Sequence, residues 1–123
     1  MTALLVALGA AVGAPMRYLT DLLVQSLHDS LMPWGTFAVN VAGSFVLGTV
    51  TAAVAAGGLS PSASALVGTG FCGALTTFST FGYETVRLVR DGARLIALGN
   101  VALSLGVGLA ACVAGWQLGT VLG

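Results

Sequence analysis

The sequence predicts an all-α integral membrane protein with four transmembrane helices, the third of them broken. Three features predict this fold class: a composition that is 57% hydrophobic and only 7% charged, long apolar stretches with short polar connections, and a glycine- and threonine-rich interruption of the third stretch. A soluble domain carries roughly a quarter of its residues as charged side chains. With a mean hydropathy of +1.01, this chain of 123 residues cannot cover itself with polar groups, so its surroundings must be largely lipid.

The few charged residues exclude several classes of function. The formal net charge is zero, with four Arg and no Lys, so nothing supports nucleic-acid binding or a phosphate-binding Gly-Lys loop. The only histidine, His28, has no second histidine or paired cysteine with which to bind a metal. Cys72 and Cys112 lie in apolar stretches, where cysteine is usually a small buried hydrophobic residue. We therefore predict that the protein is not an enzyme.

The first two spans begin and end at recognisable residues. A helix needs about 20 residues to cross the hydrocarbon of a bilayer, and residues 1–123 divide into a single domain of four spans, at about 2–27, 33–57, 61–90 and 93–121. The first span has no basic region before its apolar run, so we expect a membrane helix rather than a cleaved signal peptide. It ends in the polar residues 28–30. The second opens at Pro33 and Trp34, as at a membrane interface, and ends at Gly57 and Gly58.

The third and fourth spans complete the bundle. The third begins with a capping residue, Ser60, followed by Pro61 at the first helical position, and it is longer than a straight crossing requires. Its glycines and hydroxyl residues predict a break between about Gly73 and Thr80. Non-helical backbone is tolerated at membrane depth only where protein or water covers it, so we expect this stretch to line something other than lipid. The fourth span carries Trp116 near its far end.

Small residues recur four apart and predict close contacts between helices. Glycine and serine at this spacing let two helix backbones approach closely in lipid. The series are Gly9 with Gly13, Ser44 with Gly48, and Gly115 with Gly119 and Gly123. Because four such helices enclose little volume by themselves, we also expect the chain to form an oligomer.

Two series of polar residues recur at i, i+4 spacing, which stacks them on one helix face. They comprise Thr36, Asn40 and Ser44 in the second span, and Asn100, Ser104, Gly108 and Cys112 in the fourth. Asn40 falls near mid-membrane, and its amide offers both donors and an acceptor. Such residues either satisfy each other across a packed interface or line the path of an ion, and the pattern leaves both interpretations open.

Two further pairs of residues could belong to such a path. Arg17 and Asp21 are four apart in the first span, where ions are costly and mark either a pathway or a mutual pair. Phe78 and Phe81 share a helix face, as in ordinary core packing. Alternatively, their positive ring edges face a small anion, to which Asn40 and the neighbouring hydroxyls donate hydrogen bonds. Those hydroxyls belong to Thr76, Thr77, Ser79 and Thr80.

Three stretches together resemble the Fluc/CrcB family of fluoride channels. They are "GAPMRYLTD", "PWGTFAVNVAGSFVLG" and "GTGFCGALTTFSTFGYE", and the similarity extends over all four spans in order. The resemblance implies an antiparallel, dual-topology homodimer in the cell membrane, in which two pores let cytoplasmic fluoride leave passively. It also implies a structural Na⁺ at the dimer centre, held by backbone carbonyls at the breaks of the third spans.

The resemblance also implies roles for individual residues. Phe78 and Phe81 are similar to the paired pore phenylalanines of the family, Asn40 to its pore asparagine, and Arg17 to its first-span arginine. The remaining correspondences are Thr36, Glu84 and Ser104 on the polar pore track, and Gly73 with Thr76 as carbonyl ligands of Na⁺. One position departs from the family, because Asn100 stands where many members have tyrosine.

Two alternatives to a fluoride channel have different requirements. A four-span drug or cation exporter needs an ionisable carboxylate in the middle of its first span, whereas Asp21 lies late in that span beside Arg17. A non-transporting assembly subunit predicts polar residues that pair off without a continuous pore.

The arginines are distributed unevenly between the two sides of the predicted bundle. Arg87, Arg90 and Arg94 all lie on the side of the first and third connections. A dual-topology protein should show little such bias. A pair of homologues with fixed, opposed orientations would explain this distribution.

Overall fold

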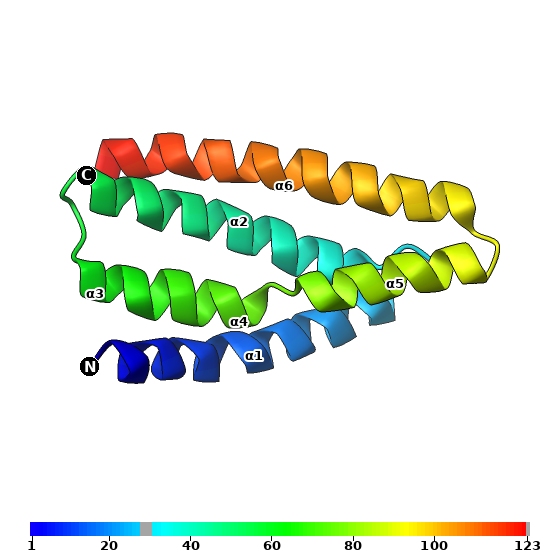
Figure 1. Ribbon diagram of the computed structural model, residues 1–123, viewed down its shortest axis with the longest axis horizontal. Helices are drawn as coiled ribbons and strands as arrows, with labels where there is room; N and C mark the ends of the chain where they lie inside the picture. The colour runs from blue at the N-terminus through cyan, green and yellow to red at the C-terminus, as the bar shows by residue number, and fades with distance from the viewer. Residues whose placement is uncertain (28–30, 123) are drawn as a thin grey trace.

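The structure, a computed structural model, describes residues 1–27 and 31–122, and the regular structure in these ranges is entirely helical. The chain runs back and forth four times along one long axis, so that both termini lie at the same end (Figure 1). The first pass is α1 (Thr2–Leu27), the second is α2 (Trp34–Ala55) and the last is α6 (Arg94–Leu122). The predicted polar end of the first span, residues 28–30, and Gly123 lie outside the described residues.

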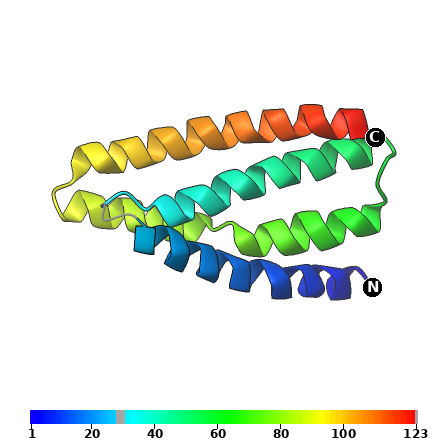
Figure 2. The ribbon, with the colours of Figure 1, turned by 180° about the vertical axis from the view of Figure 1, so that it is seen from behind.

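The third pass is assembled from shorter helices placed end to end. It consists of α3 (Pro61–Ala63), the π-helix η1 (Ser64–Cys72), α4 (Gly73–Leu75) and α5 (Phe78–Arg90). The rear view shows α5 continuing in the direction of the preceding segments after a short gap in the helix (Figure 2). The all-helical, four-pass prediction is therefore confirmed, while the π-helical winding of η1 was not predicted.

The break lies inside the predicted region. Helix α4 ends at Leu75, and Thr76 (φ −81°, ψ 157°) and Thr77 (φ −152°, ψ 114°) are both extended. Helix α5 then begins at Phe78. The Thr76 N–H still donates to the Cys72 carbonyl at 2.9 Å, but the helical hydrogen-bond ladder stops there, so the backbone groups of Thr77 need other partners.

Three of the helices are long and apolar enough to cross a membrane. They are found over Thr2–Val24, Trp34–Ala55 and Arg94–Val121. Large apolar side chains such as Leu8, Leu19 and Leu109 are exposed on the outside of the bundle, as a lipid-facing surface requires. The broken third pass offers no single helix of this kind, because its apolar half and its polar half are separate elements.

Glycine residues end two of the helices, and a capping residue begins a third. Gly57 and Gly92 adopt φ values of +86° and +84°, which residues with a Cβ rarely adopt. At each turn the next amide bonds back to the helix, from Gly58 to the Ala53 carbonyl and from Ala93 to the Leu88 carbonyl, as in a Schellman motif. The predicted cap before Pro61 is also present, because the Ser60 hydroxyl accepts from the Ala63 N–H at 3.2 Å.

Close backbone contacts hold the bundle together in two pairs. Helix α1 packs on η1, where a Cβ on Gly9 would overlap the Leu66 carbonyl. Helix α2 packs along α6, where a Cβ on Gly48 or Gly115 would overlap a carbonyl of the facing helix. The prediction that small residues bring the helices together is confirmed for these positions.

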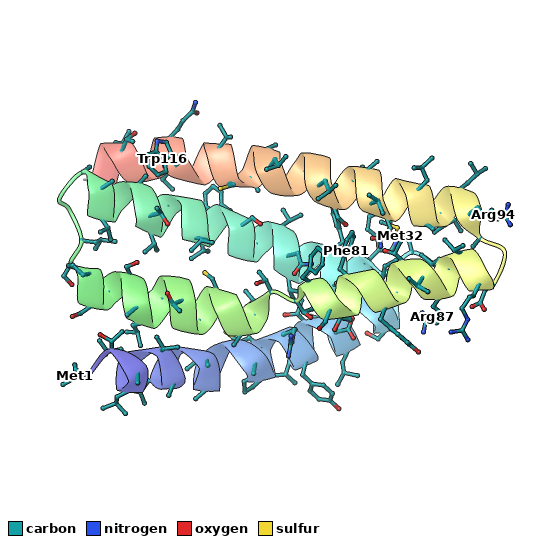
Figure 3. The ribbon with its side chains drawn as sticks, viewed as in Figure 1. Met1, Met32, Phe81, Arg87, Arg94 and Trp116 are labelled. Carbon is teal, nitrogen blue, oxygen red and sulfur yellow. The ribbon has the colours of Figure 1, made fainter. Side chains whose placement is uncertain are left out.

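Three of the four arginines, Arg87, Arg90 and Arg94, lie in the last turn of α5 and the first turn of α6. Figure 3 shows Arg87 and Arg94 at the α5–α6 turn, whereas Met1 and Trp116 lie toward the opposite end. This arrangement agrees with the uneven distribution noted in the sequence.

Candidate functional site

The amide of Asn40 in α2 hydrogen-bonds the backbone at the break through both its oxygen and its nitrogen. Its Oδ1 accepts from the Thr77 N–H at 2.8 Å, and its Nδ2 donates to the Thr77 carbonyl at 3.3 Å. An unpaired backbone group in hydrocarbon costs several kcal/mol. One side chain from a neighbouring helix thus satisfies both backbone groups of an extended residue, which explains how the break persists at this depth.

The hydroxyl groups around the break form hydrogen bonds within their own segments of the third pass. Thr77 caps α5, because its Oγ1 accepts from the Thr80 N–H at 3.2 Å. The same hydroxyl lies 3.0 Å from Thr80 Oγ1 and 3.3 Å from Ser79 Oγ. On the other side of the break, Thr76 Oγ1 donates to the Cys72 carbonyl at 2.8 Å. Part of the polarity of this stretch is therefore explained by helix capping.

The two phenylalanines lie one turn apart at the start of α5. Their ring centroids are 5.9 Å apart and their planes are inclined by 45°. The Phe78 ring is 82% exposed, while Phe81 is half-buried. Neither ring is enclosed in an apolar core within the described chain, so ordinary core packing does not explain the pair.

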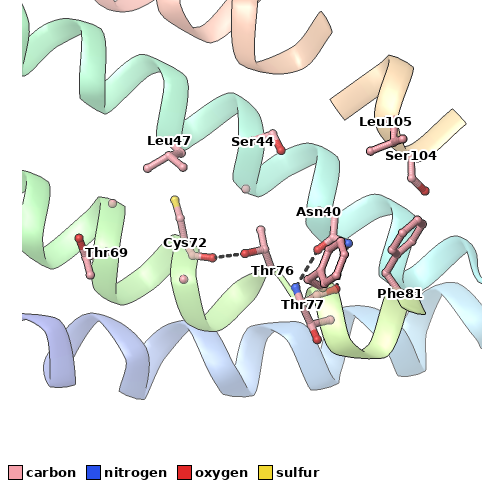
Figure 4. Close-up of a pocket in the computed structure, with 14 residues that line it drawn as sticks. Asn40, Ser44, Leu47, Thr69, Cys72, Thr76, Thr77, Phe81, Ser104 and Leu105 are labelled. Atoms are coloured by element: carbon pink, nitrogen blue, oxygen red, sulfur yellow. Dashed lines mark hydrogen bonds between the residues drawn. The ribbon is translucent and has the colours of Figure 1, made fainter. Parts of the chain in front are cut away.

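Both rings border a partly open cavity of about 540 Å³ beside the break. Figure 4 shows Asn40, Phe81 and Ser104 around it, contributed by α2, α5 and α6. Ser44, Thr69 and Thr76 add hydroxyl groups to its wall. The cavity thus combines hydrogen-bond donors with aromatic rings and contains no charged side chain among its described lining residues.

A second cavity of about 230 Å³ lies against α1. It brings together Arg17 and Asp21 of α1 with the hydroxyl residues Thr36, Thr77 and Thr80. Thr77 lines both cavities. Thr77 therefore separates the cavity that contains Arg17 and Asp21 from the cavity bordered by the two phenylalanines.

Glu84 is buried and ties α5 to α2. Its Oε1 accepts from the Thr36 hydroxyl at 2.6 Å, and the side chain is 8% exposed. Sequence reasoning placed Thr36 and Glu84 on one polar track, and the structure brings them into direct contact.

A second polar connection joins α5 to α6 and includes a residue that sequence reasoning missed. Asn100 Nδ2 donates to Thr85 Oγ1 at 2.8 Å, and Asn100 Oδ1 accepts from the Ser104 hydroxyl at 3.3 Å. Thr85 in turn donates to the Phe81 carbonyl at 2.8 Å. The one signal in the sequence was a hydroxyl residue four positions after Phe81.

The predicted cation ligands both border the first cavity: Gly73 is the first residue of α4, and Thr76 follows its last residue. The last carbonyls of a helix have no amide one turn further on, and a Cβ on Gly73 would meet open space. The described residues contain no group of three or more His, Cys, Asp or Glu that could hold a metal. A hard cation here would therefore depend on carbonyl oxygens, which suit such ions.

The fold has four helical passes, a break whose backbone groups are hydrogen-bonded by Asn40, a pair of phenylalanine rings and two adjoining polar cavities. These features place it in the class of small membrane channels and transporters. Comparison with known proteins identifies the family. The family model described as CrcB-like protein, Camphor Resistance (CrcB), matches residues 4–116. The chain therefore belongs to the CrcB family.

Named relatives are similar over most of their length. The fluoride-specific ion channel FluC 1 of Streptomyces avermitilis is 56% identical over 115 residues, which cover 94% of this chain and 93% of that protein. The protein of the same name from Frankia casuarinae is 57% identical over 110 residues, 85% of each chain. The fluoride-specific ion channel FluC of Shewanella sediminis is 49% identical over 102 residues, 83% of this chain and 82% of that protein.

These comparisons confirm the family resemblance found in the sequence. The protein is a multi-pass membrane protein of an ion-channel family and is not an enzyme. They favour the channel over the drug or cation exporter and over the non-transporting subunit.

Proposed function

We propose that the protein is a passive, fluoride-selective channel that exports cytoplasmic fluoride across the cell membrane. The observation that supports this most strongly is the cavity beside the break, where the Asn40 amide and the Phe78 and Phe81 rings meet. It occurs in a chain that is 56% identical to a fluoride-specific ion channel.

The chemistry of the cavity suits a small, strongly hydrated anion. A pore must replace the water around fluoride with many donors, yet bind the ion weakly enough for it to leave. Hydroxyls, an amide and the positive edges of aromatic rings provide these interactions without a fixed cation that would hold the ion. A buried lysine or arginine at the same place would trap it.

We assign roles along the two cavities as follows. Asn40, Phe78, Phe81 and Ser104 line the part of the pore nearest the break. Thr77 and Thr80 connect it with the second cavity, where Thr36 and its partner Glu84 continue the polar wall. Arg17 attracts the anion into that cavity by its charge.

The functional unit in this proposal is an antiparallel, dual-topology homodimer with two pores. Its support is that the first cavity is partly open, and that two of its lining residues are uncovered: the Phe78 ring is 82% exposed, and a Cβ on Gly73 would meet open space. A second copy would cover this side and keep lipid out of it. The arginine-rich end formed by Arg87, Arg90 and Arg94 leaves a pair of oppositely oriented homologues as the competing assembly.

A structural Na⁺ at the centre of the dimer is the second part of the assembly proposal. An antiparallel copy would bring two breaks together on a two-fold axis. The carbonyls of Gly73 and Thr76 from both copies would then surround one hard cation. Its role is to stabilise the breaks, and it does not move with fluoride.

Passive conduction is sufficient for export. In weakly acidic surroundings fluoride enters a cell as neutral HF and ionises inside. The membrane potential then drives the anion outward through any selective leak.

Fluoride efflux from liposomes tests the proposal. Reconstituted protein should dissipate a fluoride gradient far faster than a chloride gradient, with no proton gradient present. Equal rates for the two anions, or efflux only when a proton gradient is imposed, would contradict it.

A further inference from the structure

We propose that Thr85 and Asn100 are positioning residues that fix the rotation of α5 and thereby aim Phe78 and Phe81 at the anion path, so that fluoride selectivity depends on a hydrogen bond between α5 and α6. This inference rests on the proposed function. It assigns a role to a contact that the sequence did not reveal.

Few buried apolar side chains hold α5 in place. Of its 13 residues, only Glu84 and Leu88 are buried, so apolar packing contributes a single buried side chain. The remaining anchors are polar: Thr77 to Asn40 at the start of the helix, Glu84 to Thr36, and Thr85 to Asn100. A helix held in this way takes its orientation from its hydrogen bonds.

The hydrogen bonds of Glu84 and Thr85 leave α5 in different directions. Glu84 and Thr85 are adjacent, and successive residues of an α-helix point about 100° apart. Glu84 reaches α2, whereas Thr85 reaches α6. One anchor alone permits rotation of the helix about the contact, but two anchors in different directions fix it.

Rotation of α5 would move the rings of Phe78 and Phe81. Phe78, Phe81 and Thr85 are at positions i, i+3 and i+7, which share one face of a helix. The Thr85 hydroxyl also donates to the Phe81 carbonyl at 2.8 Å. Any rotation that moves Thr85 away from Asn100 therefore moves both rings relative to the cavity.

The side chain of Asn100 is only 1% exposed. It donates to Thr85 and accepts from Ser104 at 3.3 Å. That second distance is long for a hydroxyl donor, so the Ser104 hydroxyl, which borders the same cavity as Phe81, can turn toward a passing anion. Asn100 thus connects the Phe81 backbone, through Thr85, with the Ser104 hydroxyl on the opposite wall of the cavity.

The test compares matched variants in liposomes. Thr85→Val keeps the shape of the side chain and removes its hydroxyl, while Thr85→Ser retains the hydroxyl. Thr120→Val is the control, because the Thr120 hydroxyl is exposed and donates within α6, to the Gln117 carbonyl at 2.7 Å. The fluoride-to-chloride flux ratio should fall at least tenfold in Thr85→Val and stay close to that of the unmodified protein in the other two.

A second comparison separates positioning from folding. A role in folding alone would lower the amount of active protein without changing the ratio of the two fluxes. Asn100→Leu should change the ratio as Thr85→Val does, and the double variant should be no worse than either single one, because all three break the same connection. If Thr85→Val does not fold, the flux ratio is measured on the double variant Thr85→Val/Asn100→Leu instead. That variant has no Asn100 amide left buried without its partner.

A readout that does not depend on transport distinguishes failure of this inference from failure of the proposed function. 4-Fluorophenylalanine incorporated at position 81 reports the ring environment by ¹⁹F NMR. Thr85→Val should shift or broaden its resonance, and Thr120→Val should not. An unchanged resonance together with an unchanged flux ratio would overturn the inference. A shifted resonance in a protein that conducts no fluoride would uphold the positioning and refute the channel.

Discussion

At the scale of single residues, Asn40 is the side chain on which the break depends most. Its amide donates to the carbonyl of Thr77 and accepts from the N–H of the same residue. No other uncharged side chain than Asn or Gln carries a donor and an acceptor in this planar arrangement. Asn40 therefore both stabilises the break and presents an amide to the cavity.

Replacing this amide should stop conduction. We expect Asn40→Asp to lower fluoride flux on the order of 10³-fold, because a negative charge about 4 Å from the anion costs roughly 4 kcal/mol at an effective dielectric of 20. Flux from liposomes measures the effect, with Ser26→Ala as the control, since that hydroxyl is exposed and donates to the Leu23 carbonyl of its own helix. Unmodified flux in a folded Asn40→Asp protein would show that Asn40 does not line the path.

At the scale of elements, the third pass is the part of the fold that the rest of the molecule has to support. Its π-helix η1 packs on α1 through backbone contacts at Gly9 and Gly70. Its second half, α5, is held by polar contacts with α2 and α6. The two halves therefore depend on different neighbours, and the break allows each to follow its own.

A methyl group at the α1–η1 contact should destabilise the fold. In Gly9→Ala the new Cβ would overlap the Leu66 carbonyl and approach the Phe71 amide nitrogen, and overpacking of this kind costs about 1–3 kcal/mol. Gly99→Ala is the matched control, because a Cβ there meets no atom within 4 Å and alanine is the better helix former. Thermal stability in detergent should fall for Gly9→Ala and hold or rise for Gly99→Ala. Equal effects would contradict the close α1–η1 contact.

The sequence predicted the parts of this fold that local chemistry determines. The break was predictable because Gly73, Thr76 and Thr77 lie in a stretch unsuited to a continuous helix, and the Ser60–Pro61 start because caps act within one turn. The π-helical winding of η1, which packs closely on α1 at Gly9 and Gly70, was not predicted. The contact between Thr85 and Asn100 was missed because its two residues belong to different helices, and only their packing brings them together.

At the scale of the whole molecule, one chain leaves the cavity beside the break partly open. A partner in the opposite orientation would close it and bring two breaks together. This assembly has two consequences that can be measured separately, namely the orientation of the chains and their dependence on a cation.

Orientation can be measured by labelling from each side of the membrane. Leu31 lies in the first connection and is 63% exposed, so a thiol introduced by Leu31→Cys should react with an impermeant reagent. A dual-topology homodimer predicts equal labelling from the two sides. Labelling from one side only would favour a pair of homologues with fixed orientations and would explain the cluster of Arg87, Arg90 and Arg94.

Removal of Na⁺ should weaken the dimer. Each carbonyl left without a partner in hydrocarbon costs several kcal/mol, and a central cation would satisfy several at once. In Na⁺-free buffer we expect loss of the dimer by gel filtration and loss of fluoride flux, both restored by adding Na⁺. A dimer and a flux that ignore Na⁺ at every concentration would contradict the central cation.

The reversal potential of the reconstituted protein tests passive fluoride conduction most directly. A tenfold difference in concentration corresponds to about 1.4 kcal/mol, and about 2.3 kcal/mol corresponds to 100 mV for one charge. With a tenfold fluoride gradient, equal chloride and equal pH on both sides, the current should reverse near 60 mV, at the equilibrium potential of fluoride. Imposing a pH gradient should not move it. A reversal potential near zero, or one that follows the pH gradient, would contradict a selective and passive fluoride pore.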